Sequence, residues 1–465
     1  MTIWTPTLSG QGPRYRQLAD AIIDATTRGE LTPGTKLPPQ RRLADALGVT
    51  VGTVTRAYAL AEQQGAVSAR VGSGTYVRDT SVRSSTFDTI FEQPRQPDLI
   101  DLSHATPPPS PRRSQNLARA LEAIAGQPAA LRAGVDYQPE TGQTWQVQAL
   151  AGWLTRLGRP VEAANLLMDQ GGMHGIHLAL SALLAPGERV AAEQLTYPGL
   201  VSALSQLSLK GVAVPFDDHG IDVEALARAF EQQPFRALYV MPDCHNPTTS
   251  RLSEARREAL VALARERQFW LIEDDIYPDL PGEANTPLYR LAPECTITLF
   301  SVSKLLGGGL RVGALHAPEA ARPRLTAALR AQCWMPPPLM PMVVAHWIDS
   351  GDADALIAWQ REELAWRFDR AMERLAAFRP RGQRGGFYLW LPLPADLRSS
   401  HVVEQLRQRR VVVSSAENFC LGSVSAPQAI RVCISAAESR EALESALDTL
   451  VDTLGDPDPL LWETL

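Results

Sequence analysis

The sequence predicts two domains: a small helical domain that ends in a β-hairpin, and a large α/β domain with a mostly parallel sheet and a smaller C-terminal lobe. With 465 residues, the chain is longer than one compact domain usually is. Residues 1–78 contain three short helical patterns, whereas residues 98–465 alternate apolar runs with amphipathic helices. Residues 79–97 are polar, lack an apolar period and contain two prolines. We therefore expect a flexible linker there, with a surface loop inside one domain as the alternative.

The first domain is predicted to contain three helices and then a hairpin. The helices are expected over residues 13–29, 40–47 and 52–64. In the first helix the apolar side chains share one face, formed by Leu18, Ala21, Ile22 and Ala25. Thr50 can cap the third helix, and Gly48 and Gly65 can end the second and the third. A hairpin around Gly72 and Gly74 follows, and this order predicts a winged helix-turn-helix.

The large domain contains seven short apolar runs that we interpret as buried strands. They cover residues 165–169, 189–193, 211–216, 236–241, 269–274, 296–300 and 311–316. Amphipathic helices, such as the one expected over residues 253–267, separate them, and this alternation favours a parallel-rich sheet. Two later helices and two later strands predict the smaller lobe, and they lie at residues 354–376, 401–410, 386–393 and 430–435.

The net charge of −6 is unevenly divided along the chain. Nine basic and five acidic side chains give residues 1–78 a charge of +4, which leaves −10 for the rest. A basic first domain indicates contact with a polyanion, although a solvated helix face is the simpler alternative. The five cysteines have no CxxC spacing, and neither a long apolar stretch nor a signal peptide is present. We therefore expect a cytoplasmic protein without a membrane segment.

Chemically distinctive residues follow the predicted strands. Lys304, one of only three lysines, comes after one strand, Asp274 ends another, and Asn246 and Tyr197 each follow a further strand. The glycine-rich turn GGMHG, residues 171–175, follows the first strand and opens a helix. Taken singly, these features are compatible with a surface lysine, a solvated acidic patch, a core aromatic residue and an ordinary turn. Because all of them fall at strand ends, where loops converge, we expect a single site.

These residues meet the requirements of pyridoxal phosphate. This cofactor needs a lysine for its imine, a carboxylate for its pyridine nitrogen, donors for its phenolic oxygen, a phosphate cup and a flat group against its ring. The amides of a glycine-rich helix start suit the phosphate. A metal site is not expected, because His174 and His177 lack the spacing and the glutamate of a zinc protease. No GxSxG elbow or nicotinamide-binding GxGxxG context occurs either.

Several segments resemble known families. SVSKLLGGGLRVG resembles the lysine segment of fold-type-I aminotransferases, IEDDIY their Asp-x-x-Tyr segment, HNPTT their Asn-Pro segment, YQPETG an early tyrosine turn and AIRVCIS their C-terminal arginine strand. LPPQRRLADALGVTVGTVTRAY and GSGTYV resemble the winged helix of GntR-type regulators. In this order, the chain is identified as a member of the MocR subfamily of GntR-type transcription regulators, in which a winged helix-turn-helix is fused to an aminotransferase-like domain.

The resemblance implies a role for each matching residue of the large domain. Lys304 would form an internal aldimine with pyridoxal phosphate, and Asp274 would pair with the pyridine nitrogen, so these two are the candidate catalytic residues. Asn246 and Tyr277 would hold the phenolic oxygen, and Tyr197 would stack on the ring. The phosphate would be cupped by Ser301, Ser303, Arg311 and the turn Gly172, Met173 and His174.

The resemblance also implies partners. Tyr137 would reach the phosphate of a partner subunit, which implies a homodimer. Arg431 would take a carboxylate of a small amino-compound effector, and a salt bridge to a nearby acid is the alternative. Double-stranded DNA would be contacted by Arg41, Thr50, Thr53, Arg56, Gly72 and Gly74. Val51 stands where many GntR-type proteins have a base-reading arginine, so we expect other residues to read the sequence.

Two functions are compatible with this set of residues. In the first, the protein is a DNA-binding transcription regulator that senses an amino acid, an amine or a vitamin-B6-type compound at Lys304. In the second, it is a working aminotransferase with an appended DNA-binding domain. Transamination is chemically possible under either hypothesis, since Lys304, Asp274 and Asn246 are all present. A binding module without a cofactor does not account for these three residues.

Overall fold

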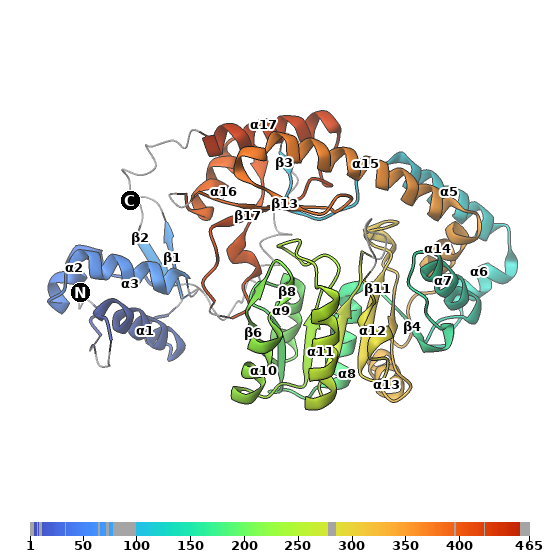
Figure 1. The fold of residues 1–465 in the computed structure, drawn as a ribbon, viewed down its shortest axis with the longest axis horizontal. Coiled ribbons are helices and arrows are strands. Elements are labelled where there is room, and N and C mark those ends of the chain that lie inside the picture. The colour runs from blue at the N-terminus through green and yellow to red at the C-terminus, as the bar shows by residue number, and fades with distance from the viewer. Residues whose placement is uncertain are drawn as a thin grey trace. The chain divides into compact units, whose positions relative to one another are not determined.

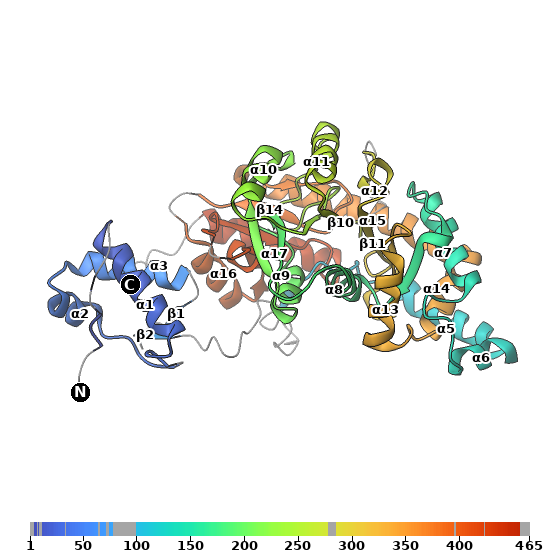
Figure 2. The same cartoon turned by 90° about the horizontal axis from the view of Figure 1, so that it is seen from below.

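The structure, a computed structural model, describes residues 4–6, 8, 12–32, 34–63, 66–70, 74–77, 99–277, 285–394, 397–422 and 424–455. Residues 4–77 of this set belong to one compact unit, and nearly all of those from 99 to 455 belong to a second (Figures 1 and 2). The predicted linker 79–97 with its boundaries, and Gly72, lie outside the described residues. No described helix is both long and apolar enough to cross a membrane.

The first unit has the predicted order of three helices and a hairpin. It contains α1 (Arg14–Thr27), α2 (Gln40–Leu47), α3 (Val51–Gln63) and the antiparallel strands β1 (Val67–Arg70) and β2 (Gly74–Val77). The amide of Thr53 donates to the Thr50 hydroxyl at 3.2 Å, which is the predicted cap of α3. Ala21 is only half-buried and Ala19 is buried instead, because the face of α1 that enters the core is centred on Leu18, Ala19 and Ile22.

A third strand-like segment completes the hairpin, and the sequence did not predict it. The amide of Leu37 donates to the carbonyl oxygen of Thr75, and the amide of Val77 donates to that of Thr35, both at 2.8 Å. The connector between α1 and α2 therefore pairs along β2. Its glycine and prolines are typical of a turn, and a contact of three residues is too short to show alternation. The Leu37 side chain is buried in the core of the unit.

The second unit is built on a seven-stranded sheet whose strands are the seven predicted apolar runs. Their order is β4 (Leu166–Asp169), β12 (Gly313–His316), β11 (Thr296–Ser301), β10 (Trp270–Asp274), β9 (Ala237–Val240), β5 (Arg189–Glu193) and β6 (Lys210–Val214). All neighbours are parallel except β12, which is antiparallel to β11 and β4. The parallel-rich sheet is thus confirmed. Burial on both faces explains why these strands are continuously apolar.

Helices cover both faces of this sheet (Figure 1). One face packs against α8 (Gly172–Leu183), α9 (Pro198–Gln206) and α13 (Arg322–Cys333). The other packs against α10 (Val223–Gln232), α11 (Glu254–Arg267) and α12 (Leu288–Leu291). A third cluster joins the β4 end of the sheet to α5 (Pro111–Ala125), α7 (Thr144–Arg156) and α14 (Leu339–Asp349). The remaining elements are α6 (Pro128–Val135) and the short strands β7 (Phe216–Asp217) and β8 (Gly220–Ile221).

The predicted smaller lobe is present at the C-terminal end. Its antiparallel sheet contains β13 (Arg381–Gly382), β14 (Leu389–Pro392), β17 (Ala429–Val432) and β16 (Ser414–Ser415). It packs with α15 (Asp352–Arg374), α16 (Ser399–Gln408) and α17 (Arg440–Gly455). In addition, β3 (Ile100–Asp101) pairs in parallel with β15 (Val411–Val412). The start of the second unit therefore belongs to this lobe, which strands of two residues could not reveal in the sequence.

A buried network of ions fixes the loops at one end of the large sheet. Arg159 Nη2 lies 2.5 Å from Asp243 Oδ2, and Arg257 Nη2 lies 2.6 Å from Asp243 Oδ1. Arg159 also pairs with Asp275. All four side chains are buried. Since Asp243 compensates two guanidinium groups at once, removing its charge leaves both of them short of a partner in the interior.

We expect Asp243→Ala to lower the free energy of unfolding of the second unit by about 3–5 kcal/mol, the cost of breaking a buried ion pair from one side. Urea unfolding followed by tryptophan fluorescence measures it. The matched control is Glu294→Ala, because Glu294 pairs with Arg265 at 2.7 Å on the surface. That change should cost about 0–1 kcal/mol. Equal losses in the two variants would contradict this account of the network.

Candidate cofactor site and DNA-contact residues

The candidate site lies at the carboxyl ends of β10 and β11. Asp274 is the last residue of β10, and Lys304 lies in the turn that follows β11. Asp274 lies opposite Leu299 of β11 in the sheet register, and the charges of Arg431, Asp274 and Arg311 all affect the pKa of Lys304. The structure thus brings together residues that are up to 157 positions apart in the chain. This meeting at strand ends is the arrangement expected for a ligand site in an open α/β sheet.

Asp274 has one satisfied oxygen and one open oxygen. Asp274 is 5% exposed, and its Oδ2 accepts a hydrogen bond from the Tyr239 hydroxyl. Among the described residues, Oδ1 is buried and has no partner. Burial raises the pKa of Asp274 to about 7, and the bond from Tyr239 opposes this rise. A buried acceptor without a donor is costly unless a ligand satisfies it, and a protonated pyridine nitrogen fits this position.

Lys304 is held in a turn that neighbouring elements fix. Its Nζ donates to the carbonyl oxygen of Ala105, and its own carbonyl oxygen accepts from Gln360 Nε2 at 2.9 Å. Arg113 Nε donates to the carbonyl oxygen of Leu306 at 2.8 Å. Burial lowers the pKa of the Lys304 ammonium to about 8, with Arg431 and Arg311 adding to the effect. Near neutral pH a sizeable fraction of this amine is therefore uncharged, as attack on an aldehyde requires.

A cup for an anion lies at the start of α8. The Ser301 hydroxyl donates to Ser303 Oγ at 3.0 Å, and Arg311 Nη1 donates to the same Ser303 oxygen at 3.3 Å. A Cβ added at Gly171 would lie 2.9 Å from Arg311 Nη2, and one added at Gly172 would lie 3.9 Å from Ser301 Cβ. Two hydroxyls, a guanidinium and a helix N-terminus therefore converge. This combination of groups suits a phosphate.

The polar groups of His174 are bound to other residues of the protein, whereas the sequence suggested that His174 would help to hold the anion. Its amide donates to the carbonyl oxygen of Gly171 at 2.8 Å, and its Nδ1 accepts from the amide of Gln170 at 3.0 Å. Its Nε2 lies 3.1 Å from Gln332 Oε1. His174 therefore uses its polar groups to close the turn. The first amides of a helix lack intrahelical acceptors, which leaves Gly172 and Met173 as the residues whose N–H groups can face an anion.

Three predicted residues surround the remaining part of the site. Asn246 Oδ1 accepts from Arg431 Nη1 at 2.7 Å, which leaves the amide hydrogens of Asn246 for another acceptor. The Tyr277 ring is buried, 5.2 Å from the ring of Phe387. Tyr197 precedes α9, and burial raises its pKa, as does the charge of Asp274. Both tyrosines therefore stay protonated near neutral pH and can donate a hydrogen bond.

Arg431 is a buried cation that has no acidic partner among the residues that the structure describes. Its Nη2 donates to the carbonyl oxygen of Ser103 at 2.5 Å, and its guanidinium carbon lies 4.6 Å from the ring centre of Phe419 and 5.4 Å from that of Tyr388. Its Nε is buried without a partner, and no acid pairs with it among the described residues. The alternative of an internal salt bridge is therefore not found in the part of the chain that the structure describes. A ligand carboxylate suits such an arginine.

Tyr137 lies at the surface of the second unit. Its side chain is 83% exposed, and its ring lies 6.1 Å from that of Trp334, which is also exposed. Val135, two residues earlier, is exposed as well. Exposed aromatic and apolar groups of this kind are typical of a protein interface rather than of a free surface.

Tyr239, whose hydroxyl donates to Asp274, was not predicted from the sequence. A buried tyrosine hydroxyl needs a partner, and this was the available signal. The partner could not be named, because it depends on how the strands pair: Tyr239 lies opposite Ile272 in the register of β9 and β10. That register places Asp274 two residues further along β10, on the same face as Ile272.

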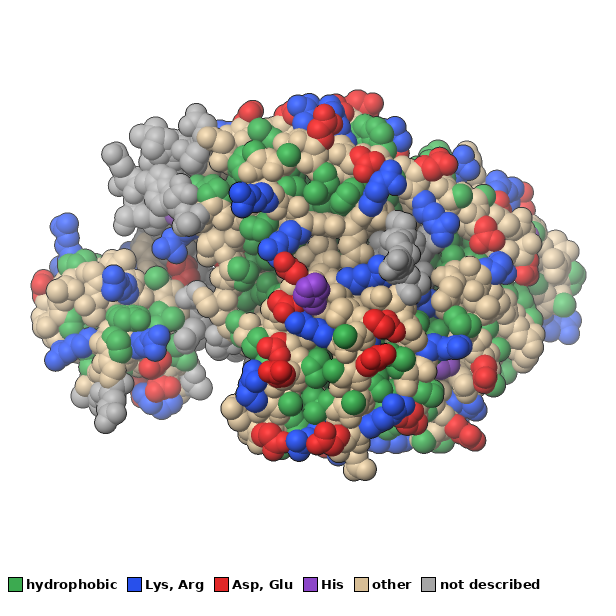
Figure 3. Space-filling model, viewed as in Figure 1, with side chains coloured by type: hydrophobic (Ala, Val, Ile, Leu, Met, Phe, Trp, Pro, Cys, Tyr) green, Lys and Arg blue, Asp and Glu red, His purple; other side chains and the backbone are tan. Residues whose placement is uncertain are grey.

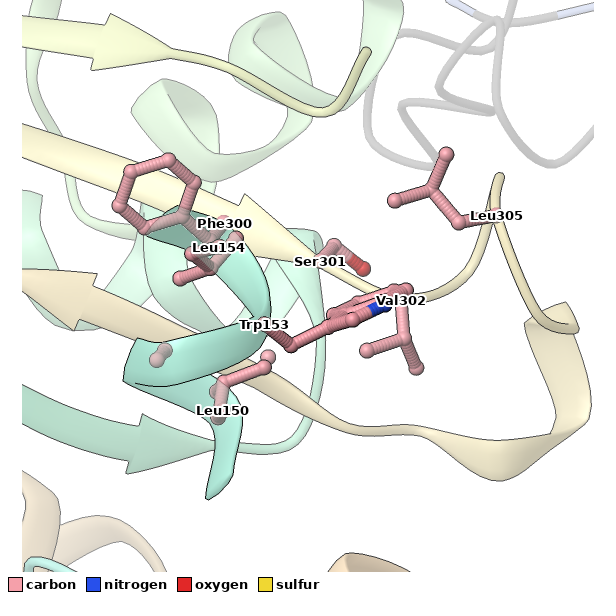
Figure 4. A pocket seen from close by; sticks show the side chains of 9 residues that line it. Leu150, Trp153, Leu154, Phe300, Ser301, Val302 and Leu305 are labelled. Carbon is pink, nitrogen blue, oxygen red and sulfur yellow. The ribbon is translucent and has the colours of Figure 1, made fainter. Parts of the chain in front are cut away.

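A small hollow lies beside the Lys304 turn, between α7 and β11 (Figure 4). Its lining is apolar apart from the Ser301 hydroxyl and the indole nitrogen of Trp153, and that nitrogen already donates to Asp354 at 2.9 Å. A charged cofactor does not fit such a lining. We therefore interpret the hollow as a packing gap behind the anion cup.

The residues predicted to contact DNA lie on α2, α3 and β2. Arg41 and Arg56 are exposed, whereas the hydroxyls of Thr50 and Thr53 lie 2.9 Å apart at the start of α3. A Cβ added at Gly74 would lie 2.7 Å from Lys36 Cε, so a side chain there would displace the end of the Lys36 side chain. On the face of the second unit that Figure 3 shows, acidic and basic side chains are interspersed, without a broad basic area.

Known families match both units. Residues 102–450 match the family of class I and II aminotransferases, and residues 14–77 match the gntR family of bacterial regulatory proteins. The chain belongs to the class I and II aminotransferase family. Together with the gntR match at its start, this is the architecture of the MocR regulators. The MocR regulator is 29% identical over 459 residues to YdeF, an HTH-type transcriptional regulator of Bacillus subtilis, with 97% of each chain covered. It is 31% identical to PdxR, the HTH-type pyridoxine biosynthesis transcriptional regulator of Corynebacterium glutamicum, with 68% of each chain covered.

Solved aminotransferases share the fold of the second unit. The α-aminoadipate aminotransferase LysN of Thermus thermophilus, complexed with N-(5'-phosphopyridoxyl)-L-leucine, has a TM-score of 0.70 at 23% identity, covering 80% of this chain and 95% of that one. A multiple substrate aminotransferase of Thermococcus profundus has a TM-score of 0.72 at 21% identity, with the same coverage. The fold is thus that of a fold-type-I aminotransferase, and it implies pyridoxal phosphate.

The lowered pKa of Lys304 predicts how its reactivity depends on pH. Since only the neutral amine attacks a carbonyl, labelling of the cofactor-free protein with a small aldehyde and borohydride should rise as the pH passes through about 8. Mass spectrometry of the Lys304 peptide measures it. Arg431→Gln removes a cation that lowers this pKa, so the profile should move to higher pH. A profile centred near pH 10.5, the ordinary value, would contradict the burial of this amine.

Loss of the Tyr239 hydroxyl should weaken the site through Asp274. Tyr239→Phe removes the bond that lowers the pKa of Asp274, so this carboxyl gains a proton at neutral pH and loses its attraction for a pyridinium. We expect affinity for pyridoxal phosphate to fall about tenfold, as for a charge-assisted hydrogen bond. Absorbance titrations at several pH values measure it. The control is Tyr289→Phe, whose hydroxyl donates to Pro160 at 3.1 Å, and equal loss there would indicate a general structural effect.

Proposed function

We propose that this MocR regulator binds double-stranded DNA as a homodimer and senses an amino compound with a carboxylate at pyridoxal phosphate. The observation that carries the proposal is the cluster of Lys304, Asp274 and Arg431. In it, an amine with a lowered pKa, a buried carboxylate with an open oxygen and a buried cation without an acid act on one another. Each of these groups is costly to bury alone, and one ligand can satisfy all three.

The residues divide the work of binding. When bound, pyridoxal phosphate supplies an aldehyde with which an amine can condense. Lys304 would supply the amine that holds the cofactor, and Asp274 would keep a proton on the pyridine nitrogen. Asn246 and Tyr277 donate to the phenolic oxygen. The cup formed by the amides of Gly172 and Met173 with Ser301, Ser303 and Arg311 holds the phosphate.

Arg431 connects the effector to a change in the protein. It lies on β17 of the small lobe, and its Nη1 donates across to Asn246, which follows β9 of the large lobe. A carboxylate on Arg431 competes with Asn246 and with the carbonyl oxygen of Ser103 for the same guanidinium. The contact between the lobes therefore differs with and without effector. Such a difference in contacts is what allows a ligand to shift a conformational equilibrium.

The position of Tyr137 supports a homodimer. Its exposed ring is available to the site of a second copy, together with the exposed apolar residues Val135 and Trp334. A twofold dimer has two copies of the first unit, residues 4–77, which we call the head. The two heads would contact two half-sites of DNA.

A second candidate function is transamination. The chain is 26% identical over 340 residues to a 2-aminoadipate transaminase of Thermus thermophilus, covering 71% of this chain and 84% of that one. It also retains Asp274 and Tyr277 at the Asp-x-x-Tyr spacing. Specific DNA binding by the full-length protein at physiological salt distinguishes a regulator from an aminotransferase with an unused head.

The central test compares wild type with Arg431→Ala. We expect the variant to keep its cofactor and its DNA binding without effector. The effector concentration that produces a response should rise at least tenfold, because the carboxylate loses its bidentate partner. Cofactor absorbance and transcription from the target promoter are followed during titration with candidate amino acids. Lys304→Ala is the matched variant in which the absorbance response disappears altogether. An Arg431→Ala protein that responds like wild type in both assays would refute the proposed sensing role.

A further inference from the structure

The exposed face of α3 is poor in charge and rich in methyl groups. One side of the helix is buried in the head, through Val54, Ala57, Tyr58 and Ala61. The opposite side is exposed and consists of Val51, Gly52, Thr55, Arg56 and Ala59. In a helix-turn-helix, the first turn of the second helix faces the edges of the bases in the major groove. Apart from Arg56, this face offers apolar contacts there.

Val51 is uncovered at the very start of α3. It is 40% exposed although it is aliphatic. The neighbouring position is open too, since a Cβ added at Gly52 would meet only Thr50 Oγ1, at 3.9 Å. An exposed β-branched residue gives a helix neither propensity nor core packing. The stability of the head therefore does not explain this valine.

Thr55, one turn after Val51, adds a second methyl group. Its hydroxyl donates to Gln40 Oε1 at 2.6 Å and to the carbonyl oxygen of Val51 at 3.0 Å. The hydroxyl hydrogen is therefore already used, and the methyl group is what Thr55 can offer to a partner. The same bond engages the side-chain oxygen of Gln40, which leaves its amide hydrogens as donors. This corner of the head thus combines two methyl-bearing residues with hydrogen-bond donors.

Thymine is the base that complements this corner. In the major groove it presents a C5-methyl group and the acceptor O4, whereas cytosine presents an amino donor at the corresponding place. In place of the sequence-based expectation that residues other than Val51 read the DNA, we propose that Val51, supported by Thr55, reads the C5-methyl group of a thymine in each half-site. This inference rests on the proposed DNA-binding function and names the base that the head selects.

The test uses the full-length, cofactor-loaded protein and a duplex that it selects from a random-sequence pool. Each thymine of that duplex is replaced in turn by uracil, which removes only the methyl group. We expect one replacement in each half-site to weaken binding by wild type about fourfold, the effect of one methyl-sized group taken out of water. With Val51→Ala, whose shorter side chain leaves Thr55 as the larger apolar contact, the preference for thymine over uracil at that position should shrink.

Two further variants separate this contact from a general loss of binding. Thr55→Ser keeps the hydroxyl for Gln40 and removes the methyl group, so the thymine preference should shrink while the fold is kept. Val51→Ala should leave the salt dependence of binding unchanged, whereas Arg56→Ala should reduce it if that arginine contacts a phosphate. A wild-type protein indifferent to every uracil, or a Val51→Ala protein with the same preference, would overturn the inference. Failure of wild type to select any sequence would instead overturn the proposed DNA-binding function itself.

Discussion

Asp274 lies buried at the end of a central strand, where, among the described residues, Tyr239 alone satisfies one of its oxygens. A carboxylate in this position must be compensated, and much of the surrounding structure serves that need. Lys304 and Tyr239 lower its pKa, whereas burial and Asp275 raise it. The result is a group close to half-ionised near neutral pH, which a cationic ring nitrogen can ionise fully on binding. The site is thus prepared for a cofactor by leaving a polar group incompletely satisfied.

The neighbouring acids show how position decides the use of a charge. Glu273, Asp274 and Asp275 are consecutive and all buried, so none of them forms the solvated patch that the sequence also allowed. Glu273 accepts from the amides of Leu288 and Tyr289, and Asp275 pairs with Arg159. Successive side chains of a strand point to opposite faces, which sends each acid to different partners. Two of the three therefore maintain the loops, and only Asp274 is left with an open oxygen.

The sequence predicted the elements that depend on burial and missed those that depend on pairing. All seven strands of the large sheet were found because burial on both faces leaves a continuous apolar run, and the first turn of α3 was found through its threonine cap. The pairing of residues 35–37 with β2 was missed, since it is made by backbone groups that carry no side-chain signal. Within the site, residue types at strand ends indicated Lys304 and Asp274. They could not indicate Tyr239, nor that His174 would spend its polar groups on its own turn, because both depend on the three-dimensional register.

The pairing of β3 with β15 has a mechanical consequence. Residues 100 and 101 follow directly after the segment that joins the head to the rest of the chain, and they are clamped to the same lobe that carries Arg431. The described chain therefore enters the second unit at the small lobe and not at the large sheet. If an effector binds Arg431 as we propose, a rotation of this lobe would also move the point at which the chain enters it. The effector and the entry of the chain that leads to the DNA-binding unit would thus be coupled through one lobe.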